Sequence, residues 1–450
     1  MDPSHTLTVT EISARIRAGQ LSPLSLVEAL LARIDALEPT VKAWVIVDRD
    51  GALETARQRA AEAQAGRFKG PLHGVPLGLK DIYHVAGMTT TAGAGAFAHE
   101  RPVEDAESVA RLRGAGAVIL GKTTTTEFAY LDPTDTRNPW NPAHTPGGSS
   151  SGSAAAVGAC MVPLALGSQT VGSTLRPAAY CGAIGFKPTY GRVSCRGVLP
   201  LAWSLDHVGI ICRSVADAAV TLQVLAGHDP GDPLSAREPV PDYVGALPRA
   251  GRPPRLGLLR QFFLERAGAE VAAHLEAIAQ ALGRAGAGLE ELKLPPSFGG
   301  IHDAGTRVMQ VEAAAFHASR FATHAEQYRP KIRELIEAGL KLSGVEYVAA
   351  QRQRRSFREE LAPLFERVDA LLMPVAGAPA PRGLGSTGDP TFCAPWSFGG
   401  LPTIALPSGV AQDGLPLAIQ LVSGAFDEPR LLAVARWCEA TLGFSAAPPG

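Results

Sequence analysis

The sequence predicts an α/β protein, in which helices pack against a β-sheet. Helical and strand-like hydrophobic patterns are mixed throughout the 450 residues, without a fixed-period repeat or a low-complexity tract. The clearest unit is residues 107–123, where an amphipathic helix, a glycine turn and a short apolar strand follow one another. An apolar content of 46% is enough to build a substantial core. We therefore expect a large globular protein.

Two helices are expected near the N-terminus, over residues 8–20 and 22–37, because both segments have helical hydrophobic spacing. Ser22 is placed to cap the second helix, and Pro23 suits its first position. The most apolar stretch, residues 154–167, is too short to span a bilayer and consists mostly of small residues, so we interpret it as core.

Later in the chain, residues 368–376 have the pattern of a buried strand. Residues 227–255 are dense in proline, glycine and charge, which predicts a long surface connection. Apolar patterns resume on both sides of this connection, so the two sides can share one core.

Charge and cysteine content narrow the possible partners. Forty-two basic and 43 acidic residues give a net charge of -1, and no basic run is present, so nucleic acid is not an expected partner. The first 20 residues lack the pattern of a secretory signal, and we expect a cytoplasmic protein that does not bind membranes. The cysteines are scattered, which predicts free thiols and no metal site; they are Cys160, Cys181, Cys195, Cys212, Cys393 and Cys438.

Residues 116–123, GAVILGKT, match the spacing of a nucleotide-binding phosphate loop. A phosphate loop presents backbone N–H groups in an open turn, whereas residues 117–120 are Ala, Val, Ile and Leu, which predict a core strand. We therefore interpret Lys122 as a lysine near a strand end.

Residues 148–152 match the G-x-S-x-G pattern of α/β-hydrolases, with Ser150 as the central serine. That motif needs a hydrophobic strand leading into the turn. Residues 137–147 are rich in proline and asparagine instead, so the required strand is missing. Taken alone, this loop is equally compatible with a flexible turn capped by Ser153.

A second serine segment follows. Residues 170–173 place a serine after a glycine, at the end of a predicted strand and before Pro177. Consecutive backbone N–H groups in such a turn can face one point, which is how an oxyanion hole is built.

These segments together carry a resemblance to the amidase signature family of serine hydrolases. The matching residues are 74–93, 116–130, 146–157, 167–194 and 395–432. The resemblance implies one large domain, residues 1–450, with a mixed central β-sheet covered by helices. Its expected parts are the N-terminal helices (1–65), the catalytic core (66–226), a connection with a less characteristic region (227–310), a helical lid over the substrate pocket (311–366) and a return to the core sheet (367–450).

The resemblance implies a catalytic group made of Ser173 as nucleophile, Ser149 as a bridging serine held by a cis peptide, and Lys80 as base. A neutral lysine can take a proton from Ser173 through Ser149. Because an exposed lysine has a pKa of about 10.4, Lys80 has to be buried for this role. Lys80 ends an apolar run, which is compatible with burial; a solvated pair with Asp81 is the alternative.

The oxyanion donors implied are the N–H groups of Thr170, Val171 and Gly172, together with that of Ser173. Many family members have glycine where this chain has Val171, whose side chain is expected to narrow the pocket. Ser151 also stands where many have glycine, and it would be strained if that position required a positive φ.

Several further residues border the implied site. Ser150 is expected to support it. Arg176 either meets a substrate carboxylate or forms a structural ion pair, and the two roles are equally compatible with the sequence. Residues 308–348 look helical and lid-like, and the histidines there, His317 and His324, are interpreted as packing or surface residues.

The function implied is hydrolysis of carbon–nitrogen bonds of amides, other than peptide bonds, through an acyl-enzyme and without metal or cofactor. Small-molecule amides and carbamates are the expected substrates, and aryl anilides and esters are compatible with the same chemistry. Three alternatives remain: an amidotransferase component releasing ammonia from glutamine or asparagine for a partner chain, an inactive binding module, and an α/β-hydrolase-type esterase using Ser150. A homodimer is compatible with all of them.

Overall fold

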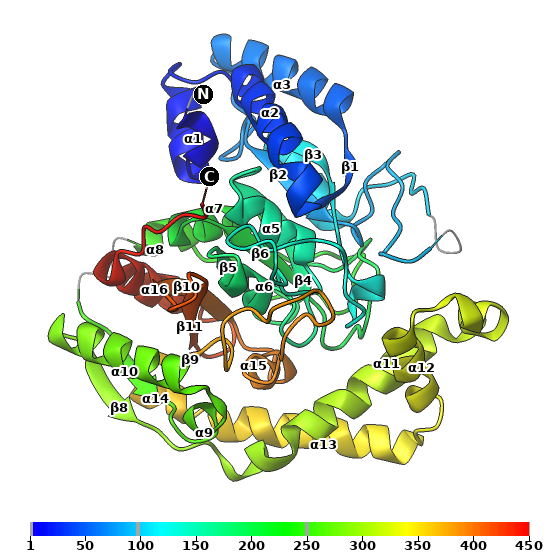
Figure 1. Ribbon diagram of the computed structural model, residues 1–450, viewed down its shortest axis with the longest axis vertical. Coiled ribbons are helices and arrows are strands. Elements are labelled where there is room, and N and C mark those ends of the chain that lie inside the picture. The colour runs from blue at the N-terminus through cyan, green and yellow to red at the C-terminus, as the bar shows by residue number, and fades with distance from the viewer. Residues whose placement is uncertain (1–2, 96–99, 248–251, 450) are drawn as a thin grey trace.

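In the part of the chain that the structure describes, eleven strands form one mixed sheet that runs through the molecule (Figure 1). The computed structural model describes residues 3–95, 100–247 and 252–449. In their order across the sheet, the strands are β1 (Trp44–Val47), β3 (Val118–Thr123), β2 (Pro76–Lys80), β4 (Leu164–Gln169), β6 (His207–Cys212), β5 (Ile184–Lys187), β10 (Thr403–Val410), β11 (Pro416–Val422), β9 (Ala370–Pro374), β7 (Arg255–Leu258) and β8 (Gly288–Glu291).

Both parallel and antiparallel pairings occur along this sheet. β2 lies parallel to both of its neighbours, β3 and β4, and β7 lies parallel to β8 and β9. The central strands from β4 to β9 pair antiparallel. The mixed central sheet expected from the sequence is therefore confirmed.

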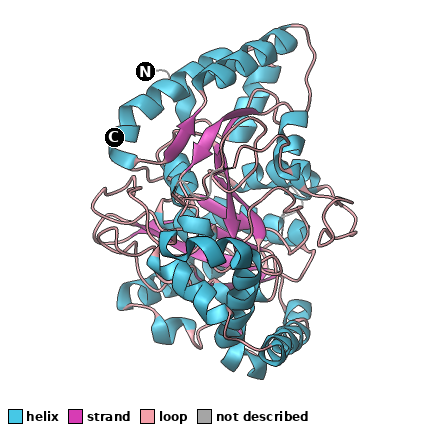
Figure 2. Ribbon diagram, turned by 90° about the vertical axis from the view of Figure 1, so that its right-hand side faces the viewer, coloured by secondary structure: helices cyan, strands magenta, loops and turns pink. Residues whose placement is uncertain are grey.

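Helices surround the sheet, and Figure 2 shows the strands enclosed between them. In Figure 1, α2 and α3 lie at the end of the molecule that holds β1 to β3, and α10 to α14 lie at the opposite end. The helices are α1 (Val9–Arg17), α2 (Pro23–Val41), α3 (Arg49–Gln64), α4 (Glu107–Gly114), α5 (Ser151–Gly158), α6 (Leu175–Tyr180), α7 (Val215–Leu225), α8 (Tyr243–Ala246), α9 (Phe263–Arg266), α10 (Ala269–Arg284), α11 (Ile301–His324), α12 (Pro330–Gly339), α13 (Gly344–Leu361), α14 (Leu364–Arg367), α15 (Ala394–Phe398) and α16 (Glu428–Leu442).

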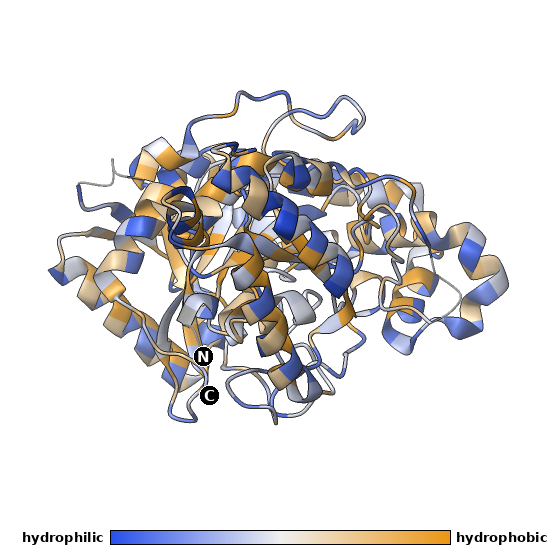
Figure 3. Cartoon of the chain, turned by 90° about the horizontal axis from the view of Figure 1, so that it is seen from above, coloured by the Kyte–Doolittle hydropathy of each residue, from blue (hydrophilic) through white to orange (hydrophobic). Residues whose placement is uncertain are grey.

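One hydrophobic cluster joins the N-terminal helices to the last helix, from Leu7 to Cys438. It includes apolar residues of the 154–167 stretch, as the sequence predicted. The peripheral helices carry both hydrophilic and hydrophobic residues (Figure 3), as expected where one helix face covers a core. Among the described residues, no helix is both long enough and apolar enough to cross a membrane.

Both expected N-terminal helices form, and the cap expected for the second one is present. The Ser22 side chain accepts a hydrogen bond from the Leu24 N–H, and Pro23 opens α2. At α1, Thr8 and Glu11 form a reciprocal capping box, in which each side chain bonds to the backbone of the other.

The predicted strand around residues 117–120 is β3, in which all six residues are buried. Lys122 lies in this strand, and its Nζ donates to Asp81 Oδ1 at 2.7 Å and to Thr90 Oγ1 at 3.0 Å. The GAVILGKT segment is therefore strand rather than an open turn, and its lysine belongs to a buried ion pair.

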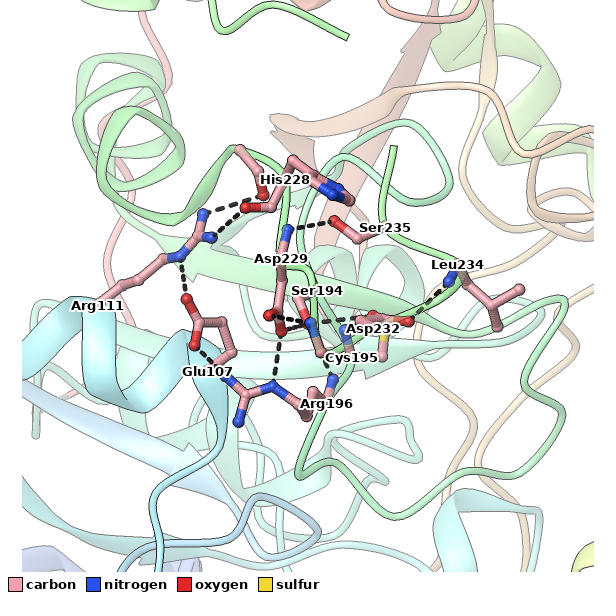
Figure 4. A network of polar contacts seen from close by, with 12 residues as sticks. Glu107, Arg111, Ser194, Cys195, Arg196, His228, Asp229, Asp232, Leu234 and Ser235 are labelled. Atoms are coloured by element: carbon pink, nitrogen blue, oxygen red, sulfur yellow. Dashed lines mark hydrogen bonds and ion pairs between the residues drawn. The ribbon is translucent and has the colours of Figure 1, made fainter. Parts of the chain in front are cut away.

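The connection predicted at residues 227–255 is fastened to the core near its start (Figure 4). Asp229 and Asp232 both accept from the Ser194 hydroxyl, at 2.8 and 3.1 Å. Arg196 Nε also donates to Asp229, at 2.8 Å. Residues 248–251 of this connection lie outside the described residues. The two aspartates therefore attach the first part of this connection to residues 194–196, whereas the sequence predicted only a surface connection.

Candidate active site

Three segments meet at one edge of the sheet: the end of β2, the loop before α5 and the turn between β4 and α6. β2 and β4 are neighbouring parallel strands, so their carboxyl ends lie at the same edge. Lys80 is the last residue of β2, and Ser173 follows β4 by four residues. Helix α5 packs against both strands and brings the preceding loop, with Ser149, to the same place.

Lys80 is fully buried and makes two hydrogen bonds to hydroxyl groups. Its Nζ donates to Ser149 Oγ at 2.6 Å and to Ser168 Oγ at 2.7 Å. Burial lowers the pKa of Lys80 to about 7, and the nearby Asp206 carboxylate opposes this shift. The amine is therefore poised to exist in both protonation states near neutral pH.

The alternative of a solvated Lys80–Asp81 pair is wrong. Lys80 is fully buried, and Asp81, which follows the end of β2, accepts from Lys122 Nζ at 2.7 Å and from the Thr91 N–H at 3.0 Å. The charge that acts on Lys80 comes from Asp206, whose own pKa is raised to about 6 by burial.

Ser149 follows a cis peptide bond with Gly148. Its loop touches the nucleophile turn through the backbone, since the Ser150 N–H donates to the Ser173 carbonyl at 3.2 Å. In the part of the chain that the structure describes, no hydrogen bond joins the hydroxyls of Ser149 and Ser173. Lys80 and Ser149 are thus in direct contact, and Ser173 lies on the adjoining turn.

Ser173 is partly exposed and lines a cavity of about 460 Å³. Thr170, Val171 and Gly172 line the same cavity. Across residues 3–95, 100–247 and 252–449, the N–H groups of Val171, Gly172 and Ser173 have no hydrogen-bond acceptor. Three unused backbone donors beside a serine hydroxyl are what an oxyanion hole needs.

Ser150 and Ser151, in the loop of residues 148–152, make hydrogen bonds to the protein backbone. Ser150 is fully buried; its hydroxyl donates to the Ser168 carbonyl and accepts from the Ser168 N–H, each at 3.2 Å. No histidine among the described residues bonds to Ser150. Ser151 opens α5 without a positive φ, so the strain considered for it is absent, and its Oγ donates to the Gly147 carbonyl at 2.7 Å.

Arg176 is buried, and one of its nitrogens, Nη2, donates to the Gly148 carbonyl at 2.7 Å and to Thr387 Oγ1 at 3.2 Å. It forms no ion pair within the described residues, which contradicts the structural ion pair considered from the sequence. Its Nε and Nη1 are buried and have no acceptor in the described part of the chain, and the residue lines the cavity. Burial lowers the pKa of Arg176.

The outer wall of the cavity comes from the peripheral helices. Helix α11 contributes His302, Gly305, Thr306 and Met309, and α15 contributes Phe398 among others. His317 of α11 is buried, with Nδ1 bonded to the Tyr328 hydroxyl at 3.0 Å, which agrees with its interpretation as a packing residue.

Two site groups were missed from the sequence, Ser168 and Asp206. Ser168 stands five residues before Ser173 in the same strand-turn segment, and its side-chain direction depends on strand register. Asp206 accepts from Thr170 Oγ1 at 2.5 Å and from two backbone N–H groups of the 201–202 turn. Asp206 is far from Lys80 in the sequence, so no local motif indicated that the two residues lie near each other.

Comparison with known proteins shows a match to the family model described as Amidase over residues 25–432. An amidase from Pseudomonas putida is 40% identical over 95% of this chain and 94% of its own length. A second relative, from Roseiflexus castenholzii, is a component of glutamyl-tRNA(Gln) amidotransferase, and it is 39% identical over 96% of this chain and 95% of its own.

A solved structure supports the same relationship. The native peptide amidase from Stenotrophomonas maltophilia superposes with a TM-score of 0.87 at 33% sequence identity, covering 99% of each chain. Sequence and fold therefore agree over almost the whole length of the molecule.

Proposed function

This chain belongs to the amidase family, and we propose that it hydrolyses amides through an acyl-enzyme formed on Ser173. The observation that carries the proposal is the buried Lys80, bonded to Ser149 beside the cavity that Ser173 lines. A lysine whose pKa is lowered to about 7 can act as a base at neutral pH.

Acylation begins when the Ser173 hydroxyl attacks the substrate carbonyl carbon. Its proton passes to Ser149 Oγ, and the Ser149 proton passes to neutral Lys80 Nζ. As the carbon–nitrogen bond breaks, the same path returns a proton to the leaving nitrogen. Water then attacks the acyl-enzyme by the reverse sequence and releases the carboxylic acid.

The developing oxyanion is stabilised by backbone N–H groups of the 170–173 turn. Among the residues that the structure describes, the N–H groups of Val171, Gly172 and Ser173 have no other acceptor. Losing one such donor typically costs about 3 to 4 kcal/mol of the barrier, so the turn is a major part of the mechanism.

Substrate choice follows from the cavity. Its volume of about 460 Å³ suits small-molecule amides, and carbamates, anilides and esters fit the same acyl-transfer geometry. Arg176 is proposed to contact a polar substrate group through its unpartnered Nε or Nη1, while Nη2 supports the Ser149 loop.

A second candidate function is that of an amidotransferase component, which the 39% identity to the Roseiflexus castenholzii protein favours. In that case the acyl donor is glutamine or asparagine, and ammonia goes to a partner chain. The catalytic chemistry at Ser173 is the same, and dependence on a partner distinguishes the two.

A cytoplasmic location and a homodimer are proposed as accompanying properties. All six cysteines are free thiols, which suits a reducing compartment. Size-exclusion chromatography with light scattering distinguishes the homodimer from a monomer.

The test is a substrate panel of aliphatic amides, anilides, carbamates and carboxylate-bearing amides, assayed with the chain alone. We expect turnover that disappears in Ser173→Ala, falls severely in Ser149→Ala and Lys80→Ala, and survives each single histidine substitution. Arg176→Ala should lower turnover of every amide, because Nη2 supports the Ser149 loop, and should lower it further for carboxylate-bearing amides if Arg176 binds a carboxylate. Full activity of Ser173→Ala contradicts the proposal, and activity only with glutamine and an added partner favours the amidotransferase.

A further inference from the structure

The turn that carries the proposed oxyanion donors is held from behind by two side chains, Gln169 and Ser397. Gln169 is the last residue of β4, immediately before the turn, and Ser397 lies in α15, 228 residues later. Both side chains are fully buried. We call this pair and its hydrogen bonds the Gln169–Ser397 clamp.

The Gln169 side chain, which precedes the turn, is hydrogen-bonded to the backbone that follows the turn. Its Oε1 accepts from the Thr174 N–H at 2.9 Å and from the Leu175 N–H at 3.0 Å. These N–H groups belong to the start of α6, where Thr174 provides no side-chain cap. With Oε1 occupied as acceptor, the amide nitrogen Nε2 is left to donate, and it donates to Ser397 Oγ at 2.9 Å.

Ser397 links the Gln169 side chain to the backbone in the middle of the turn. Because its Oγ accepts from Gln169 Nε2, its single proton is free to donate, and it donates to the Val171 carbonyl at 2.7 Å. The hydrogen bonds therefore have one consistent direction, from the glutamine amide through the serine to the carbonyl.

Fixing this carbonyl also fixes the next N–H. In a trans peptide unit the C=O and the following N–H lie in one plane and point in opposite directions. Holding the Val171 oxygen towards Ser397 consequently directs the Gly172 N–H away from Ser397. Gly172 lines the cavity, whereas Ser397 does not.

We propose that the Gln169–Ser397 clamp positions the Gly172 N–H as an oxyanion donor by locking the Val171–Gly172 peptide plane. Gln169 and Ser397 are positioning residues, since neither touches the substrate. Without the clamp the peptide can rotate and turn the Val171 oxygen towards the developing negative charge. This inference rests on the proposed function.

Ser397→Ala tests the clamp by removing the hydroxyl that joins Gln169 to Val171. We expect kcat to fall roughly tenfold to 100-fold, approaching the effect of losing one oxyanion donor. KM should stay within about twofold, because the donor acts mainly in the transition state. Binding of a boronic acid, which forms a tetrahedral anionic adduct with a serine, should weaken by a factor similar to the loss in kcat.

Ser423→Ala is the matched control. Ser423 is a buried serine whose hydroxyl donates to the Asp427 carbonyl at 3.2 Å, and it does not line the cavity. Ser423→Ala should keep the wild-type kcat, while its melting temperature changes by about as much as that of Ser397→Ala. Wild-type kcat and boronic acid affinity in Ser397→Ala, or equal kcat losses in both variants, would overturn the clamp.

Gln169→Glu provides a second, nearly isosteric test. A carboxylate keeps the acceptor for the N–H groups of residues 174 and 175, but it draws the Ser397 proton away from Val171. Protonation restores a donor towards Ser397, so the activity of this variant relative to wild type should rise as pH falls from 8 to 6. A relative activity independent of pH would contradict the clamp.

Ser173→Ala in the same assay separates this inference from the proposed function. If Ser173→Ala is inactive while Ser397→Ala and Gln169→Glu keep wild-type kcat, the clamp fails and the acyl-enzyme proposal stands. Full activity of Ser173→Ala overturns both.

Discussion

Lys80 is central to the proposed chemistry, and its burial affects the stability of the protein. It ends a buried strand, donates to two hydroxyl groups and has a pKa lowered to about 7. Lys122, on the neighbouring strand β3, is also buried but is paired with Asp81. Among the described residues, Lys122 has a carboxylate in contact, whereas Lys80 donates to two hydroxyl groups and to no carboxylate.

The first prediction concerns the pH dependence of turnover. In the proposed mechanism the neutral amine of Lys80 is the active form, and its fraction rises as pH rises through about 7. For an anilide without titrating groups, kcat/KM should increase with pH and level off above about pH 8. Asp206→Asn should move the inflection to lower pH, because the Asp206 carboxylate raises the pKa of Lys80. A flat profile between pH 5.5 and 8.5 would contradict the role of Lys80.

The second prediction concerns stability. The pKa of Lys80 is lowered on folding from an ordinary value of 10.5, so the unfolded chain binds the extra proton between pH 7 and 10.5. Burial of this lysine therefore costs on the order of 4 kcal/mol below pH 7, and the cost shrinks as pH rises towards 10.5. Lys80→Met should be more stable than wild type at pH 6.5, by chemical denaturation, with a smaller advantage at pH 9.

Lys122→Met is the contrasting variant for this measurement. It leaves the buried Asp81 carboxylate without its partner, which typically costs about 3 to 5 kcal/mol. Loss of stability in Lys80→Met at both pH values, similar to that in Lys122→Met, would show that Lys80 is a structural cation.

Helix α11 contributes several residues to the wall of the cavity. Met309 lines the cavity from this helix, whereas Ala315 of the same helix is exposed. A helical lid was expected over residues 311–366, whereas the α11 residues that line the cavity lie before that range, between Ile301 and Met309. Cavity-lining residues are concentrated in this first part of α11.

We predict that Met309→Trp discriminates between substrates by size. The larger side chain reduces the cavity, so kcat/KM for a bulky anilide should fall at least about tenfold, while that for a small aliphatic amide changes little. Ala315→Trp adds a bulky side chain on the exposed face and should leave both values unchanged. If Met309→Trp lowered kcat/KM equally for both amides, substrates would not bind against Met309.

The fold was predictable where local patterns decide it. Ser22 and Pro23 marked the start of α2, and the apolar run at residues 117–120 marked β3. The contacts that hold the site join distant parts of the chain: Lys122 meets Asp81 across 41 residues, and Gln169 meets Ser397 across 228. Side-chain direction and long-range pairing of this kind depend on the folded sheet, so no local pattern could reveal them.

The whole molecule is expected to unfold as one unit. Its hydrophobic cluster joins residues of α1 to residues of α16, on both sides of the 227–255 connection. Differential scanning calorimetry should therefore give one main transition. Ser194→Ala, which removes the one hydroxyl donor that Asp229 and Asp232 share, should lower its midpoint without splitting it. Two resolved transitions would indicate separable domains.

The most direct test of the acyl-enzyme at Ser173 is to trap it with an aryl carbamate, whose carbamoyl-enzyme hydrolyses slowly. The intact mass should rise by one carbamoyl group, and peptide fragmentation should place that group on Ser173. The adduct should be absent in Ser173→Ala and form much more slowly in Lys80→Ala. An adduct on Ser150 or on a cysteine, or turnover by Ser173→Ala, would contradict the account.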